Sequence, residues 1–202
     1  MQGPRSVISR LDALTWVDVP KPFASTIFDG PLSGLDTRTR PMPTPVLHLL
    51  CGKIASGKST LARSLKAEHS AILLSEDHWL SKLYPDQIKS VADYVLHARR
   101  IRDVLGPLVI DMLSAGTPVV LDFPANTPAD RHWLRSLADT AKVPHRVHYI
   151  EVEDDTCRRR LHHRNARAEH DFAATDAEFD LITSYFRAPD QAEGLDVVIH
   201  RT

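Results

Sequence analysis

The chain has 202 residues, 43% of them hydrophobic and 25% charged, and its formal net charge is −1 at pH 7. This is an ordinary globular composition, and a charge so close to zero gives no overall field that would attract nucleic acid or an anionic membrane. Only two cysteines occur, and no stretch approaches 18 consecutive apolar residues. We therefore expect a protein of a reducing compartment without membrane spans, most simply a cytoplasmic one.

The first part of the sequence differs from the rest. Residues 1–45 contain half of the chain's 14 prolines. Proline fixes φ and removes a backbone donor, so this part cannot form a long helix or a central strand. We predict a Pro-rich N-terminal extension over residues 1–45 and one folded domain over residues 46–202.

From residue 46 onward, short apolar runs alternate with amphipathic stretches. The runs, typical of buried parallel strands, are residues 46–51, 71–75, 118–123, 146–152 and 196–200. The stretches, in which apolar residues recur every three to four positions, predict helices at 58–69, 87–115, 128–141, 154–169 and 175–187. We expect Gly106-Pro107 to kink or divide the second helix. Five strands separated by helices predict a three-layer α/β domain around a parallel sheet.

The segment GKIASGKST follows the first strand and opens the first helix. It matches G-x-x-x-x-G-K-[ST], which a random chain of this length would contain on the order of 1% of the time. In such a loop the glycines let consecutive N–H groups face phosphate oxygens, the lysine reaches the β- and γ-phosphates, and the hydroxyl after it ligates Mg²⁺. The predicted nucleotide-binding residues are Gly52, Ala55, Ser56, Gly57, Lys58, Ser59 and Thr60, with Ser59 also a metal ligand.

Two carboxylates end the second strand in the segment SEDHW. Parallel sheets bind ligands at the carboxyl ends of their strands, so we expect Glu76 and Asp77 to face the cleft on the substrate side. There Asp77 can accept the proton of a substrate hydroxyl that attacks the γ-phosphate. The alternative is a helix N-cap, and Asp77 can serve both purposes.

Asp122 ends the third strand, where a carboxylate holds Mg²⁺ in proteins of this kind. The alternative is a simple turn residue. The segment FPANTPADR follows, and we place its Asn126 and Arg131 among the substrate-contacting residues. Asp130 in the same segment is expected to cap a helix rather than to take part in catalysis.

Five arginines occur in CRRRLHHRNAR, residues 157–167. On a helix, Arg160, Arg164 and Arg167 fall on one face, which can close over a triphosphate as a lid and stabilise the charge of the transferring group. The alternative is a solvated basic face, the usual fate of a charge run. We choose Arg160 and Arg164 as the catalytic lid residues.

Taken in order, GKIASGKSTLA, LLSEDHW, VVLDFPANTPADR, CRRRLHHRN and YFRAPDQAEGLDVVIH resemble the AAA_33-type P-loop kinases. That group is related to the zeta toxins, chloramphenicol phosphotransferase and the kinase domain of polynucleotide kinase. The resemblance covers about residues 46–200. It implies a five-stranded sheet in the order 2-3-1-4-5, ATP as donor, Asp77 as general base, and lid arginines at Arg160 and Arg164.

The expected activity is Mg²⁺·ATP-dependent phosphorylation of a small-molecule hydroxyl. An acidic patch after the lid, together with the carboxylates near Asp77, favours a cationic acceptor such as an aminoglycoside antibiotic; these carboxylates are Glu76, Asp86, Asp171, Asp176, Glu178 and Asp180. A nucleotide-sugar kinase of the zeta-toxin kind and a nucleotide-gated interaction protein remain the alternatives. We do not expect a polynucleotide partner, since the sequence contains no basic track outside the lid.

Overall fold

The computed structural model describes residues 44–167 and 172–201. The predicted N-terminal extension lies outside these residues, except for its last two positions. The elements are β1 (Leu47–Cys51), α1 (Lys58–His69), β2 (Ile72–Ser75), α2 (Glu76–Leu83), α3 (Val91–Ser114), β3 (Val119–Pro124), α4 (Pro128–Ala141), β4 (His145–Glu151), α5 (Asp154–Arg167), α6 (Asp176–Ser184), the 3₁₀-helix η1 (Gln191–Glu193) and β5 (Val197–Arg201). No helix in this part of the chain combines the length and the apolar character needed to cross a membrane.

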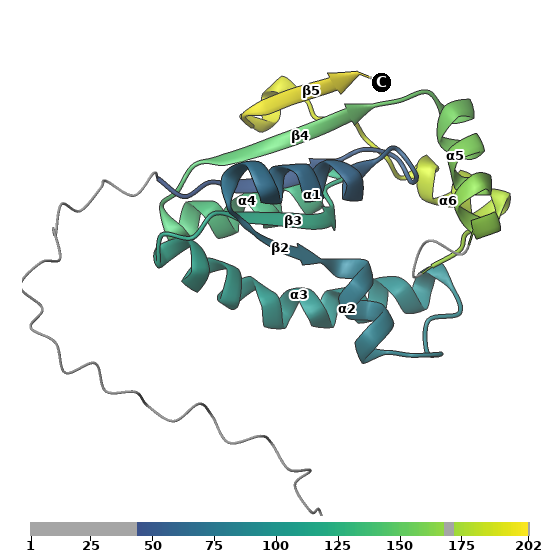
Figure 1. Cartoon of the computed structure of the whole chain (residues 1–202), viewed down its shortest axis with the longest axis horizontal. Coiled ribbons are helices and arrows are strands. Elements are labelled where there is room, and N and C mark those ends of the chain that lie inside the picture. Colours follow the sequence, from purple (N-terminus) through teal and green to yellow (C-terminus); the bar gives the residue numbers. More distant parts are fainter. Residues whose placement is uncertain (1–43, 168–171, 202) are drawn as a thin grey trace, which may run out of the picture. The chain divides into compact units, whose positions relative to one another are not determined.

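The five strands form one parallel sheet in the order β2-β3-β1-β4-β5 (Figure 1). This confirms the predicted fold class and strand order. Helices cover both faces of the sheet, and α5 and α6 lie beyond the carboxyl ends of the strands. Because the strands are parallel, the loops that leave those ends gather at one edge of the sheet, where ligands bind in such folds.

The two faces of the sheet are buried against different helices. Leu47 and Leu49 of β1 belong to the main core with residues of α3 and α4, such as Leu105 and Leu134. Leu50, on the opposite face of the strand, packs instead in a smaller cluster with residues of α1. This alternation follows from the two-residue period of a strand, and it places α1 on one face and α3 with α4 on the other.

Helix α3 is continuous through the Gly106-Pro107 pair. Pro107 lies inside it, so Gly106-Pro107 does not divide the 24-residue helix. The residues that face the core include Ala98, Ile101 and Leu105, whereas Val95 is 62% exposed. The sequence also contains the short helix α2, which we had not predicted as a separate element; it begins directly after β2 with Glu76.

A row of histidines crosses the α1 face of the sheet. The Nδ1 of His48 lies 3.0 Å from the Nε2 of His148, and the Nδ1 of His148 lies 3.0 Å from the Nε2 of His200. His48 also stacks on His69 of α1, with ring centroids 4.5 Å apart. Burial lowers the pKa of both His48 and His148 to about 4, so both rings are neutral at pH 7.

Candidate active site

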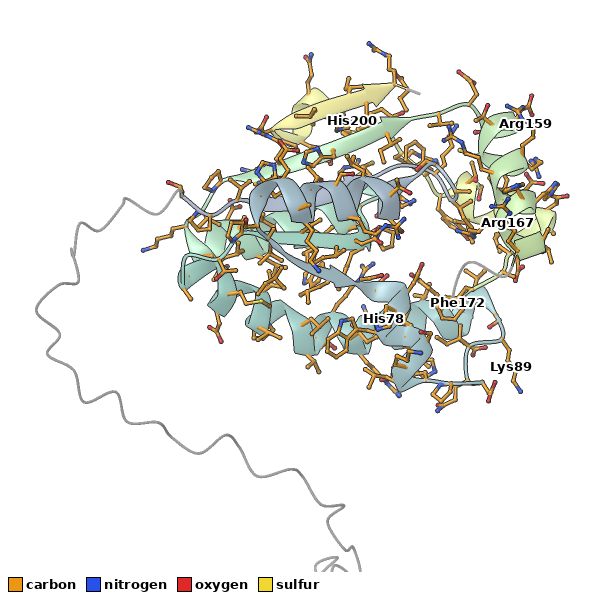
Figure 2. All side chains as sticks on the ribbon, in the orientation of Figure 1. His78, Lys89, Arg159, Arg167, Phe172 and His200 are labelled. Atoms are coloured by element: carbon orange, nitrogen blue, oxygen red, sulfur yellow. The ribbon has the colours of Figure 1, made fainter. Side chains whose placement is uncertain are left out.

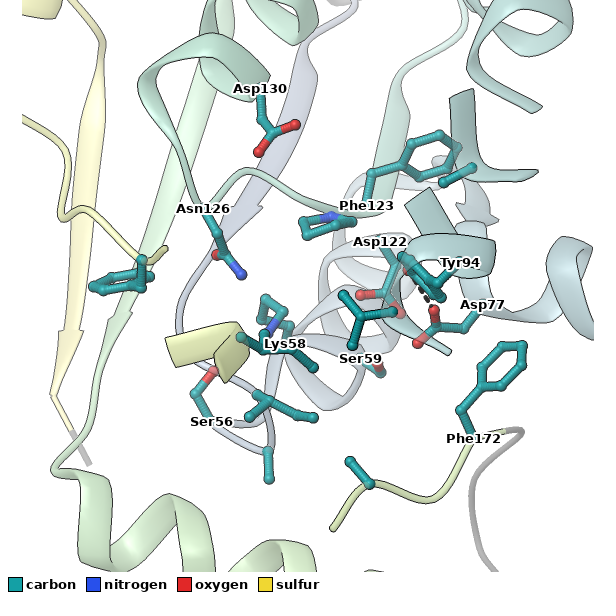
Figure 3. Close-up of a pocket in the computed structure, with 18 of the residues that line it drawn as sticks. Ser56, Lys58, Ser59, Asp77, Tyr94, Asp122, Phe123, Asn126, Asp130 and Phe172 are labelled. Carbon is teal, nitrogen blue, oxygen red and sulfur yellow. Dashed lines mark hydrogen bonds between the residues drawn. The ribbon is translucent and has the colours of Figure 1, made fainter. Parts of the chain in front are cut away.

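A cleft opens where the strands end, between the loop after β1 and helices α2, α3 and α5 (Figure 3). Most of the predicted site residues line it: Ala55, Ser56, Gly57, Lys58, Ser59, Thr60, Asp77, Asp122, Asn126, Arg160 and Arg164. Gly52 lies at the start of the loop. The structure therefore brings together residues from five separate segments of the sequence.

The loop between β1 and α1 depends on backbone conformations that favour glycine. Gly57, the residue before α1, has φ 110°, and Ala55 has φ 59°. At Gly52 an added Cβ would lie 2.7 Å from the Ser56 Oγ and 3.1 Å from the carbonyl oxygen of Ile150. The loop thus turns tightly enough to deliver the chain directly into the N-terminus of α1, whose partial positive charge attracts phosphate.

Lys58 is folded against its own loop. Its Nζ donates to the carbonyl oxygens of Gly52 and Lys53, at 2.7 and 2.8 Å. Burial lowers the pKa of Lys58, while the nearby charges of Asp122 and Asp77 act in the opposite direction. A lysine held in this way presents a fixed positive charge to the cleft.

Two side chains from other elements brace the same loop. The N–H of Gly52 donates to the Asn126 Oδ1 at 3.0 Å, from the segment after β3. Arg160 of α5 donates through Nη1 to the carbonyl oxygen of Ser56 at 3.1 Å. Both side chains also line the cleft, so they couple the phosphate loop to the segments that would contact a bound nucleotide.

Ser59 and Asp122 are the candidate metal ligands. Ser59 lies in the first turn of α1, and Asp122 is half-buried near the end of β3. Both line the cleft beside Lys58, and a hydroxyl together with a carboxylate is a donor set that Mg²⁺ accepts alongside nucleotide phosphates. The two residues fit a Mg²⁺ ion, which would supply positive charge to the nucleotide phosphates.

Asp77 lies in the first turn of α2 and reaches the cleft from the side opposite Asn126 (Figure 3). The hydroxyl of Tyr94, from α3, donates to the Asp77 Oδ1 at 2.7 Å. The ring of Tyr94 in turn meets Phe172 edge to face, with centroids 6.0 Å apart. Sequence reasoning missed Tyr94, because nothing in the pattern of α3 separates it from a residue of the core.

The prediction that Glu76 faces the substrate is wrong. Its side chain is 1% exposed and does not line the cleft. It accepts from the Nε of Arg102 at 2.8 Å and lies 3.0 Å from the hydroxyl of Tyr94. Arg102 also donates to Asp130 at 2.7 Å, and Asp130 bonds Thr127, the N-cap of α4. Glu76 is therefore one member of a buried network that joins α2, α3 and α4.

The prediction for Arg131 is also wrong. This side chain is fully buried, and two of its nitrogens donate to the carboxylate of Glu193, at 2.8 and 2.7 Å. A third donates to the carbonyl oxygens of Ala125 and Arg187, at 3.1 and 2.8 Å. Arg131 thus fastens η1 and the segment before it to α4, and it has no donor directed at the cleft.

The described carboxylates of the acidic patch after the lid have bonding partners within the protein. Arg158 pairs with Asp176 at 3.3 Å and with Asp180 at 2.7 Å. Glu178 bonds Thr175 and so completes the capping box of α6. Asp171 lies outside the described residues. Arg158 offsets part of the negative charge of this patch, which weakens our reason for expecting a polycationic acceptor.

Helix α5, which carries Arg159 and Arg167, lies beyond the carboxyl ends of the strands (Figure 2). Besides Arg160, it contributes Arg159 and Arg164 to the wall of the cleft. Burial lowers the pKa of Arg164, against the charge of Asp77. Whether this helix closes over a bound nucleotide as a lid stays a prediction.

Residues 47–189 match the family model AAA_33, described as an AAA domain. The match extends over most of the chain, from β1 through the phosphate loop and the candidate base to the segment after α6. The chain belongs to the AAA_33 family. A comparison with curated protein sequences found no match.

Solved structures with a similar fold include kinases and a protein with a bound nucleotide. A candidate kinase from Chloroflexus aurantiacus has a TM-score of 0.64 at 19% identity, with 78% of this chain and 85% of that one covered. Kti12 of Chaetomium thermophilum, in complex with ADP-AlF3, has a TM-score of 0.59 at 18% identity (78% and 89% covered). The APS kinase CysC of Mycobacterium tuberculosis, in complex with AMPPNP and APS, has a TM-score of 0.54 at 20% identity (79% and 89% covered). These likenesses establish the fold, and with the family match they confirm the resemblance to P-loop kinases.

Proposed function

We propose that this protein transfers the γ-phosphate of ATP to a hydroxyl group of a small molecule. The observation that carries the proposal is that Lys58 of the phosphate loop and the carboxylate of Asp77 line one cleft. A phosphate-binding cation and a candidate base on facing sides of a cleft are the minimum that phosphoryl transfer to an alcohol requires. The family match and the structures of kinases with this fold support the same reaction class.

In the proposed reaction the acceptor oxygen attacks the γ-phosphorus, and the bond from that phosphorus to the oxygen shared with the β-phosphate breaks. The proton of the acceptor hydroxyl passes to Asp77, and ADP leaves. Lys58, Arg160 and Arg164 offset the charge on the transferring group. Ser59 and Asp122 would hold Mg²⁺, which supplies further charge neutralisation on the phosphates.

The acceptor stays open within this class. An aminoglycoside was our expectation, but the ion pairs of Asp176 and Asp180 weaken the reason for it. The cleft wall near Asp77 combines aromatic side chains with both charges, including Tyr94, Phe172, Trp133, Lys89, Arg102 and Asp103. Such a wall suits an acceptor with a ring and mixed polar groups better than a polycation.

The test is to incubate the purified protein with Mg²⁺ and ATP and a panel of aminoglycosides, chloramphenicol, nucleotide sugars, sugars and 5′-hydroxyl oligonucleotides. Mass spectrometry then detects an added phosphate. We expect one product class that the Asp77→Asn variant forms at least 100-fold more slowly, because a general base contributes about 10²- to 10⁴-fold. The matched control is Asp86→Asn, a substitution outside the cleft, which keeps the wild-type rate.

Two results would contradict the proposal. Wild-type turnover by Asp77→Asn would remove Asp77 from the reaction. Tight ATP binding with slow hydrolysis and no phosphorylated acceptor would favour the alternative of a nucleotide-gated interaction protein.

A further inference from the structure

The candidate base is held by a chain of partly buried polar groups that the predicted mechanism does not use. The chain runs from Asp77 to the hydroxyl of Tyr94, from there to Glu76, and from Glu76 to Arg102. Its members come from α2 and α3, and Asp130 of α4 anchors its far end. Four of the five side chains are therefore connected by hydrogen bonds to one carboxylate that faces the cleft, that of Asp77.

The geometry at Tyr94 restricts where protons can lie. Its hydroxyl oxygen is 2.7 Å from the Asp77 Oδ1 and 3.0 Å from the Glu76 Oε2. A tyrosine hydroxyl has a single hydrogen, so it cannot donate fully to both carboxylates. Once the hydroxyl donates to one carboxylate, its oxygen faces the second carboxylate with a lone pair. The lone pairs of these two oxygens repel, so the contact is favourable only when the second carboxylate is protonated and donates to the hydroxyl oxygen.

We propose that Tyr94 is a positioning residue for Asp77: its hydroxyl donates to Asp77, while Glu76, anchored by Arg102, donates to the oxygen of Tyr94 and fixes its direction. This inference rests on the proposed function, in which Asp77 is the general base. Asp77 lies closer to the hydroxyl and lines the cleft, whereas Glu76 is buried. We therefore assign Asp77 as the acceptor of the Tyr94 hydrogen and Glu76 as the donor to the Tyr94 oxygen.

The charged and titratable groups around the chain agree with this assignment. Burial raises the pKa of Glu76, against the opposing effects of Arg102 and Tyr94. Burial also raises the pKa of Tyr94 well above its ordinary value, and Glu76 and Asp77 add to the rise, so the hydroxyl keeps its proton. Asp77 in turn acts to raise the pKa of Lys58 and of Arg164, against the effect of their burial.

The first test is the Tyr94→Phe variant, which keeps the ring and its contact with Phe172 but removes the hydroxyl. In crystals grown with ADP and Mg²⁺ we expect the Asp77 carboxylate to leave its wild-type orientation. With the acceptor found by the panel, we expect kcat to fall about 10- to 100-fold and the KM for ATP to stay within two-fold. The matched control is Tyr84→Phe, since Tyr84 stacks on His97 between α2 and α3 without lining the cleft.

The second test asks whether Glu76 acts as a hydrogen-bond donor to Tyr94 or through its negative charge. A glutamine at this position can accept from Arg102 through its oxygen and donate to Tyr94 through its nitrogen, as protonated Glu76 does. We therefore expect Glu76→Gln to lose less than three-fold in kcat, and Glu76→Ala to lose at least ten-fold. Equal losses in the two variants would overturn the assigned direction of the hydrogen bonds.

The two proposals fail in different ways. If the wild-type protein phosphorylates no acceptor, the proposed function fails, and the crystal structures still decide whether Tyr94 positions Asp77. If Asp77 keeps its orientation in Tyr94→Phe, or if kcat stays within two-fold of the wild type, the positioning role of Tyr94 is wrong while the proposed kinase activity stands.

Discussion

The nucleotide half of the cleft is made largely of backbone, whereas the acceptor half is made of side chains from several helices. The first half is one continuous segment, Gly52 to Thr60, whose shape depends on glycine conformations and on the N-terminus of α1. The second half joins Asp77, Tyr94 and Arg102, which no local pattern connects. A backbone site needs certain residue types at fixed spacing, so it is visible in the sequence. A side-chain site needs the tertiary fold before its members meet.

The largest expected effect comes from the lysine side chain of the nucleotide half, Lys58. Lys58→Met removes the only charge that the loop itself holds against its carbonyl oxygens. We expect kcat/KM to fall at least 100-fold, because removing one preorganised stabilising group costs about 10²- to 10³-fold. Turnover of ATP with the acceptor from the panel measures the loss.

Lys53→Met is the matched control for this prediction. Lys53 belongs to the same loop, but its ammonium forms an ion pair with Asp154 and it does not line the cleft. We expect its rate to stay within three-fold of the wild type. Similar losses at both lysines would show that the loop needs general positive charge rather than one placed lysine.

The sequence was sufficient for the sheet because each strand has a strong local signal. The strand runs around Leu47 and Val119 contain consecutive apolar residues, as expected where both faces are buried, and the sheet has the predicted order. The phosphate loop followed from spacing alone. Asp77 was proposed because it closely follows a strand at the ligand-binding edge, a position that topology defines before any contact is known.

The acceptor half was harder to predict because burial changes the meaning of a charged residue. Glu76 and Asp77 are neighbours in the sequence, yet one is 1% exposed against Arg102 and the other lines the cleft. Arg131 is a charged residue near a predicted site, but the partner that buries it, Glu193, lies 62 positions away. Only the contacts between distant segments separate such residues, and a sequence pattern contains no signal for them.

A smaller effect tests whether the nucleotide half depends on backbone shape. In Gly52→Ala the new Cβ would meet Ser56 and Ile150, so we expect ADP affinity to fall about ten-fold and stability to fall by about 1–2 kcal/mol. Calorimetric titration with ADP and urea unfolding measure the two losses.

The control is Gly116→Ala, at a glycine with φ 84° and open space around its Cα. Backbone strain alone costs about 1–2 kcal/mol for an L-residue in this region, so its stability should fall without a change in ADP affinity. If both variants lose affinity equally, the effect of Gly52 comes from global strain, and the loop has no special shape requirement.

The smallest expected effect on the rate concerns buried polar groups that belong to neither half. His48 and His148 do not line the cleft, so replacing both by leucine should leave kcat within two-fold at pH 7.5. Their effect should appear in stability instead. Both pKa values are about 4 in the fold and 6.5 in the unfolded chain, so the unfolded state binds more protons between these values.

The sign of this linkage gives a sharp prediction for pH. The stabilisation is complete above pH 6.5 and is lost as the pH falls towards 4, with about 2 kcal/mol lost by pH 5 for one such histidine. Urea unfolding at a series of pH values should therefore show a shallower acid decline in the double leucine variant than in the wild type. His132→Gln, at an exposed histidine of α4, should follow the wild-type curve. If the double variant also followed the wild-type curve, carboxylates rather than the buried imidazoles would cause the acid decline. A large loss of kcat in the double variant would instead extend the catalytic site beyond the two halves of the cleft.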